Sequence, residues 1–154
     1  MQNMYMQARK RAALWNERLS SREKAAELLG LHESSLADYE LDNVKVVPVD
    51  RVNAMADLYN CPELRTKYCK YVCPLGQDLP IATETGSLEA SVINVLKAFD
   101  EDRLNQMRRD LIDIAVDGKV SADEVELFGK IIEIMDDMMR VISGLKLIRE
   151  RMKG

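Results

Sequence analysis

The stretch "REKAAELLGLHESSLADYE", residues 22–40, decides the fold that the sequence predicts. It has the pattern of two short amphipathic helices that meet at Gly30, where a left-handed backbone conformation costs glycine little. Two helices that cross this closely need a small residue at the crossing, and Ala26 stands four positions before the glycine. The pattern is typical of a helix-turn-helix rather than of an arbitrary helical hairpin. The flanking apolar supports are Ala25, Leu29, Leu31, Leu36 and Tyr39.

Helical patterns continue on both sides of this stretch, and no strand pattern or internal repeat is present. Residues 4–19 have apolar side chains at three- and four-residue spacing, which predicts one helix before the motif. Serine caps helices well, and proline is favoured in the first helical turn. Residues 1–75 are therefore expected to form a compact domain of five helices. The expected starts are Met4, Ser20 or Ser21, His32 or Ser34, Pro48, and Pro62.

The pattern changes after residue 75. Residues 76–86 contain proline and glycine without helical periodicity, which predicts a linker. Residues 87–154 are expected to form a long two-helix hairpin over 87–116 and 121–152, joined by a turn at Asp117-Gly118-Lys119. The predicted fold class is all-α.

The composition is that of an ordinary globular protein: of 154 residues, 47% are apolar and 31% are charged. Residues 1–75 carry 11 basic and 10 acidic side chains, whereas residues 76–154 carry 11 and 16, so the acidity belongs to the second half. No apolar run approaches the ~20 residues that span a bilayer. The first residues have their charges after the apolar positions, unlike a secretory signal, and three cysteines do not make a disulfide framework. We expect a cytoplasmic protein with no membrane partner.

Residues 1–75 resemble the phage-repressor (Cro/C1, or XRE) helix-turn-helix family. The resemblance rests on a basic first helix (Arg9-Lys10-Arg11), the Ala26–Gly30 motif, Tyr39-Glu40 at the end of the next helix, and the later segment "VNAMADLYN". It implies a lambda-repressor-like domain, a bacterial transcriptional regulator, and a homodimer on double-stranded DNA with the third helix in the major groove. By position it implies base contacts from Glu33, Ser34 and Asp38, and contacts at or near phosphates from Arg22, His32, Ser35 and Lys45.

Two features depart from the family pattern. Leu41-Asp42-Asn43 follows the glutamate where family members often have Asn-Gly, so the loop that grips phosphate is altered. The recognition helix is also acidic, and its charges face one phosphate per ~1.7 Å of duplex. Carboxylates accept hydrogen bonds from cytosine, so they select bases while lowering affinity. The alternative is a helix-turn-helix that serves as a protein-interaction module, in the manner of an antirepressor or antitoxin.

The cysteines offer a third interpretation, a thiol or metal sensor using Cys61, Cys69 and Cys73. Zinc and iron–sulfur sites need four ligands, and the single histidine, His32, lies in the recognition helix, so we expect no metal and no other cofactor. Residues 113–124 have the outline of a calcium loop, but Ala115 stands at a ligand position. A helical turn in which Ser121 and Glu124 form a capping box explains that segment without an ion.

No catalytic pattern of Ser/His/Asp or Cys/His and no phosphate-binding glycine loop is present, so neither an enzyme nor a small-molecule substrate is expected. The last predicted helix carries two apolar stripes, and packing on one neighbouring helix needs only one of them. We expect a second subunit to cover the other, giving a four-helix bundle; the alternative is that it packs on the N-terminal domain. The stripe assigned to dimerisation contains Ile131, Ile134, Met138, Val141, Leu145 and Ile148.

Overall fold

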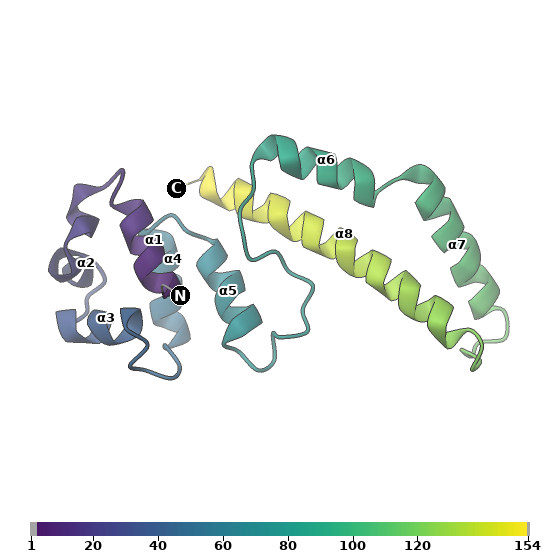
Figure 1. The fold of residues 1–154 in the computed structure, drawn as a ribbon, viewed down its shortest axis with the longest axis horizontal. Coiled ribbons are helices and arrows are strands. Elements are labelled where there is room, and N and C mark those ends of the chain that lie inside the picture. Colours follow the sequence, from purple (N-terminus) through teal and green to yellow (C-terminus); the bar gives the residue numbers. More distant parts are fainter. Residues whose placement is uncertain (1–2, 154) are drawn as a thin grey trace. The chain divides into compact units, whose positions relative to one another are not determined.

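The computed structural model describes residues 3–153, which form helices and connecting segments without any strand (Figure 1). The prediction of an all-α protein is confirmed. The chain divides into two compact units: unit 1 contains residues 1–79 and 149–154, and unit 2 contains residues 80–148. The helices are α1 (Met4–Ala12), the 3-10 helix η1 (Glu17–Ser20), α2 (Arg22–Leu28), α3 (Glu33–Glu40), α4 (Val49–Leu58), α5 (Glu63–Tyr71), α6 (Leu88–Ala98), α7 (Glu101–Ala115) and α8 (Val125–Arg151).

The turn between α2 and α3 has the geometry that the sequence predicts. Gly30 has a φ of +63°, in the left-handed region. Its N–H donates to the Glu27 carbonyl, and the Leu31 N–H donates to the Ala26 carbonyl, which is the Schellman pattern for ending a helix. Ala25 and Ala26 are both buried, so no larger side chain holds α2 and α3 apart.

The core of unit 1 draws on every helix from α1 to α5. Its largest fully buried apolar side chains are those of Leu19, Leu36, Met55 and Leu64, from four different elements. Burying each such side chain contributes about 1.5–3 kcal/mol. The single helix predicted over residues 4–19 is wrong: α1 ends at Ala12 and η1 follows, because Asn16 accepts a hydrogen bond from the Arg18 N–H and starts a new helix.

Unit 2 is built from α6, α7 and α8, with α6 and α7 following one another along α8 (Figure 1). The predicted single helix over 87–116 is therefore wrong. The chain breaks at Phe99-Asp100, because Asp100 adopts an extended backbone and its side chain accepts a hydrogen bond from the Arg103 N–H at 3.0 Å. An acidic N-cap of this kind is a strong start signal for a new helix. Unit 2 thus has three helices in place of the predicted two-helix hairpin.

The turn before α8 is longer than predicted. Gly118 has a φ of +71°, and the Ser121 N–H donates to a Glu124 carboxylate oxygen at 2.8 Å, which is one half of the predicted capping box. The helix itself begins at Val125 rather than at Ser121. Its last residues, from Arg149, belong to unit 1, which the sequence did not predict. Within residues 3–153, no helix combines the length and apolar character required to cross a bilayer.

Candidate nucleic-acid interface

A buried carboxylate fixes α3 in unit 1. Glu40, in the last turn of α3, is 1% exposed and accepts hydrogen bonds from Arg9 Nε at 2.5 Å and Arg9 Nη2 at 3.0 Å. Arg22, at the start of α2, donates to the same carboxylate through Nε at 3.0 Å. The hydrogen bond to Glu40 raises the pKa of Arg9 above its ordinary value, although burial acts in the opposite direction.

The same arginine reaches a fourth element. Arg9 Nη1 donates to the backbone carbonyls of Leu19 at 2.9 Å and Ser20 at 3.1 Å, at the end of η1. Hydrogen bonds to ionised groups are stronger than neutral ones, and a bidentate pair also fixes orientation. The network therefore holds α1, η1, α2 and α3 in one arrangement, with the other face of α3 left outward.

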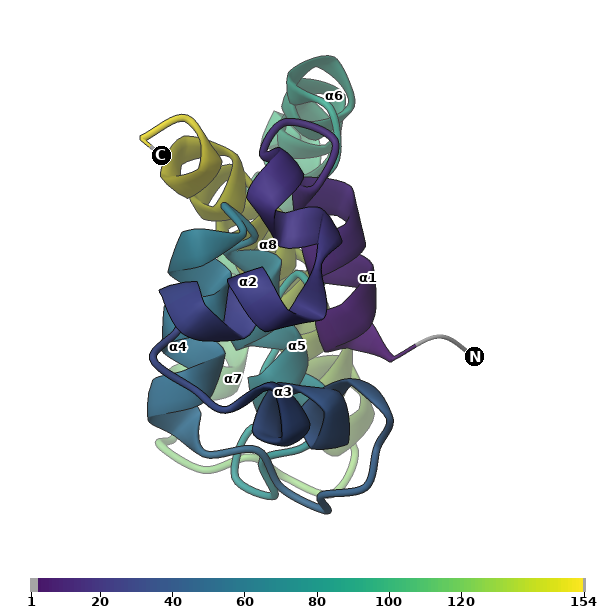
Figure 2. The same ribbon diagram turned by 90° about the vertical axis from the view of Figure 1, so that its left-hand side faces the viewer.

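The outer face of α3 carries the residues that the sequence assigned to base contacts. Glu33 and Ser34 are exposed in its first turn, and Asp38 is half-buried one turn later, whereas Leu36 and Glu40 point into the core. Figure 2 looks onto unit 1 from the side that carries α2 and α3. The structure thus places Ser34 and Asp38 one turn apart on the same face of α3, while Glu33 is exposed in the first turn, about 140° round the helix from Asp38.

Asp38 is held by Asn43, which the sequence analysis named only as part of the altered loop after α3. Asn43 Nδ2 donates to Asp38 Oδ1 at 3.0 Å, and the Asn43 N–H donates to the Asp38 carbonyl at 3.0 Å. Asp42 between them has a φ of +59°, so this loop ends α3 with a Schellman turn like the one at Gly30. One carboxylate oxygen of Asp38 already accepts a hydrogen bond, which leaves the group less able to contact a base by itself.

The residues assigned to phosphate contacts lie in different settings. Lys45 is exposed in the loop after α3, and His32 is the exposed N-cap residue of α3 without a side-chain capping bond. Ser35 is half-buried on the rim of α3. The Arg22 side chain is 30% exposed while its Nε is 3.0 Å from the Glu40 carboxylate.

Two apolar residues on the outer face were missed. Ala37 is half-buried, and Leu41, directly after α3, is 53% exposed. Together with Ser34 they recur at three- and four-residue spacing, which was the available signal in the sequence. Apolar side chains in such positions contact the thymine methyl group in the major groove. The outer face therefore mixes acidic, hydroxyl and apolar groups.

A second buried carboxylate lies on the far side of the same unit. Glu63, the first residue of α5, is 1% exposed, and its Oε1 accepts hydrogen bonds from Arg11 Nη1 at 3.0 Å and Arg151 Nη2 at 2.5 Å. Burial alone raises the pKa of Glu63, but its backbone hydrogen bond and Arg151 outweigh burial, so this pKa lies below the ordinary value. Asn60 adds a hydrogen bond to the Arg151 carbonyl at 3.2 Å. These bonds fasten residues 149–153 to α1 and α5.

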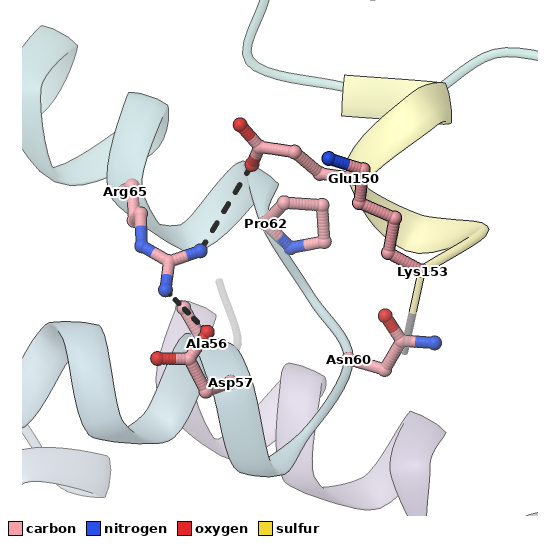
Figure 3. A pocket seen from close by; sticks show the side chains of 7 residues that line it. All are labelled: Ala56, Asp57, Asn60, Pro62, Arg65, Glu150 and Lys153. Carbon is pink, nitrogen blue, oxygen red and sulfur yellow. Dashed lines mark hydrogen bonds and ion pairs between the residues drawn. The ribbon is translucent and has the colours of Figure 1, made fainter. Parts of the chain in front are cut away.

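A pocket of about 460 Å³ lies beside this contact (Figure 3). Arg65 crosses it, donating to Asn53 Oδ1 at 3.0 Å and Asp57 Oδ1 at 2.5 Å, and its Nη1 is 4.0 Å from a Glu150 oxygen. The wall groups therefore satisfy one another, which is the arrangement of a surface ion-pair cluster that supports residues 149–153. The lining residues are Ala56, Asp57, Asn60, Pro62, Arg65, Glu150 and Lys153.

The three cysteines do not converge with other ligands. Cys61 is buried, and Cys69 and Cys73 are half-buried. Burial, and then the neighbouring Glu63 carboxylate, raises the pKa of the Cys61 thiol to about 12, so this thiol stays protonated at neutral pH. Across residues 3–153, no three His, Cys, Asp or Glu side chains are grouped as a metal site would need.

The stripe of α8 assigned to dimerisation lies mostly inside unit 2. Ile131 is 1% exposed, and the rest of the stripe (Ile134, Met138, Val141, Leu145 and Ile148) is half-buried. The exposed apolar side chains of α8 belong chiefly to the other stripe. They include Val125, Ile132, Met139 and Ile142. The stripe assigned to dimerisation is therefore the more covered of the two within one protomer, and the other stripe leaves more apolar surface exposed.

Comparisons of this chain with family models, with curated proteins and with solved structures found no match.

Proposed function

We propose that the protein binds double-stranded DNA at specific sequences, as a homodimer with α3 in the major groove, and thereby regulates transcription. The observation that carries the proposal is the outward face of α3, presented by a helix that Glu40 and two arginines hold rigidly. A major groove about 12 Å wide admits one α-helix, and base readout needs hydrogen-bonding side chains on its outer face. Ser34 and Asp38 are such side chains, and Glu33 is exposed in the first turn of the same helix.

The charges around α3 give the proposal a distinctive form. Glu33 and Asp38 accept hydrogen bonds when ionised, so each favours a base with an amino group, cytosine or adenine. The same carboxylates repel phosphates, and the nearby basic side chains of Arg22, Lys24 and Lys45 offset only part of that repulsion. We therefore expect modest affinity, strong salt dependence and selectivity that comes from the acidic face.

Selection of bound duplexes from a random pool, at low and at moderate salt, tests the proposal. An inverted repeat should be enriched, since a two-fold dimer presents two copies of α3. No enriched motif at low salt would contradict the proposal and favour a second candidate, a helix-turn-helix that binds a protein through its acidic face. The observation behind that candidate is the run of carboxylates at Glu33, Asp38 and Asp42.

Two variants separate base contacts from phosphate contacts. Asp38→Asn keeps the size of the side chain and removes its charge, so it should raise non-specific affinity while weakening preference at one base position by about 1–3 kcal/mol. Lys45→Ala should weaken all duplexes about equally and flatten the salt slope by roughly one unit. Asp78→Asn, an exposed position in the same unit outside α2 and α3, is the matched control and should bind as the wild type does.

A further inference from the structure

Helix α6 is rich in apolar residues but is poorly covered. Its sequence, LEASVINVLKA, contains two charged residues, Glu89 and Lys97. The apolar stripe of such a helix is normally buried against a neighbouring element. In this structure Ala98 is its buried residue, Ser91 and Val95 are half-buried, and the remaining side chains are exposed.

The exposed side chains form one continuous face. Leu88, Val92, Leu96 and the following Phe99 recur at four-, four- and three-residue spacing and are 53%, 45%, 69% and 40% exposed. Ile93, at 52%, widens the face on one side. With about 150 Å² for each large apolar side chain, the exposed part amounts to roughly 400 Å². That area matches the largest apolar patch of a typical monomer and is about half of what one partner contributes to a stable interface.

The two charges of α6 identify what covers this face. Glu89, Ile93 and Lys97 are spaced by four residues and form a row beside the apolar row Leu88, Val92 and Leu96. Glu89 and Lys97 lie at equal distances before and after Ile93. When two copies of α6 pack antiparallel about a two-fold axis at Ile93, each Glu89 lies opposite the Lys97 of the other copy. Parallel packing would instead place like charges at the same height.

We infer that α6 is the centre of an isologous dimer interface, in which the Leu88–Phe99 face of one protomer packs antiparallel on the same face of a second copy. Two Glu89–Lys97 ion pairs close one rim of this interface. The inference rests on the proposed function and adds to it, because the two-fold axis of this dimer provides the second copy of α3 that an inverted repeat requires. The test of the interface itself needs no DNA.

Sedimentation of the full chain at micromolar concentration tests the interface. The wild type should sediment as a dimer, and Val92→Glu with Leu96→Glu should sediment as a monomer while keeping its helical circular dichroism. The matched control is Leu14→Glu with Leu75→Glu, which places the same two charges at exposed apolar positions of unit 1 and should leave the dimer intact. A monomeric wild type, or a dimer that survives the α6 variant, would overturn the inference.

A charge exchange tests the antiparallel register itself. Glu89→Lys alone, or Lys97→Glu alone, places like charges opposite each other twice and should raise the dimer dissociation constant on the order of tenfold. The double variant E89K/K97E restores both pairs and should return to the wild-type constant. If the double variant is as weak as the two single variants combined, the antiparallel α6 pair is wrong. If the wild type is a dimer that the α6 variant dissociates, but random-pool selection returns no enriched motif, the proposed function is wrong and the α6 interface is still supported.

Discussion

Units 1 and 2 differ in how completely they bury their apolar side chains. Among the described residues of unit 1, sixteen buried hydrophobic residues form one core that extends from α1 to α5. In unit 2, four apolar side chains among the described residues are buried, those of Ala98, Ile114, Ile131 and Leu147. Unit 2 instead exposes large apolar side chains along α6 and α8. A domain that folds alone has the first pattern, whereas the second is expected of a helical unit completed by a partner.

The units also differ in buried charge. Arg9, Glu40 and Glu63, which are the buried charged residues of the part described, all lie in unit 1. Each is paired, and each pair joins elements that are distant in the sequence. Buried pairs of this kind are costly to break, because the remaining partner keeps its desolvation penalty. Unit 1 should therefore respond sharply to single substitutions that unit 2 would tolerate.

The largest effect is expected at Glu40. Glu40→Ala leaves Arg9 buried without its carboxylate and should lower the free energy of unfolding of unit 1 by about 3–5 kcal/mol. Urea titration followed by fluorescence of Trp15, the single tryptophan of the chain, measures this. Glu33→Ala, an exposed position on the same helix, is the control and should stay within about 0.5 kcal/mol of the wild type. Equal effects at the two positions would show that the network does not hold α3.

Acid should weaken unit 1 through Glu63. Because the pKa of Glu63 is lower in the folded state than in the unfolded state, its contribution is present above pH ~4.3 and is lost as the pH falls further. Glu63→Gln keeps an acceptor oxygen but removes the charge that strengthens the hydrogen bonds from Arg11 and Arg151. It should lower the free energy of unfolding at neutral pH by about 1–2 kcal/mol and make this free energy depend less on pH in acid. The measurement is the free energy of unfolding between neutral and acid pH. If the free energy of unfolding falls equally steeply with acid in the variant and in the wild type, the lowered pKa of Glu63 is not the cause.

The smallest effects are expected at two glycines, where substitution by alanine should change the free energy of unfolding in opposite directions. Gly30 has a positive φ, so Gly30→Ala should lower the free energy of unfolding by about 1–2 kcal/mol although space for a methyl group exists. Gly129 lies in the regular helix α8 with equally open surroundings, so Gly129→Ala should raise it by about 0.5–1 kcal/mol. Thermal unfolding of both variants is the measurement. A stabilising Gly30→Ala would mean that the turn relaxes easily, against the rigid presentation of α3.

Much of unit 1 was predictable because its signals are local. The Schellman turn at Gly30 depends on residues within one turn of the chain, and so do the cap at Ser21 and the start of α4 after Pro48. The breaks at Ala12 and Phe99 were missed because apolar periodicity continues across them, while the capping residues Asn16 and Asp100 compete with it. Periodicity predicts that a segment is helical better than it predicts where one helix ends.

For the candidate interface, too, some features followed from local sequence and others only from the tertiary structure. The sequence by itself determined that Ser34 and Asp38 share one face of a helix, since residues four apart on a helix lie one above the other. The tertiary structure decided that Glu40 draws Arg9 and Arg22 together, that Glu63 binds Arg151 from the far end of the chain, and which stripe of α8 is covered. Such pairings depend on which helices meet in three dimensions. Side-chain spacing along one helix carries no information about the helix that packs against it.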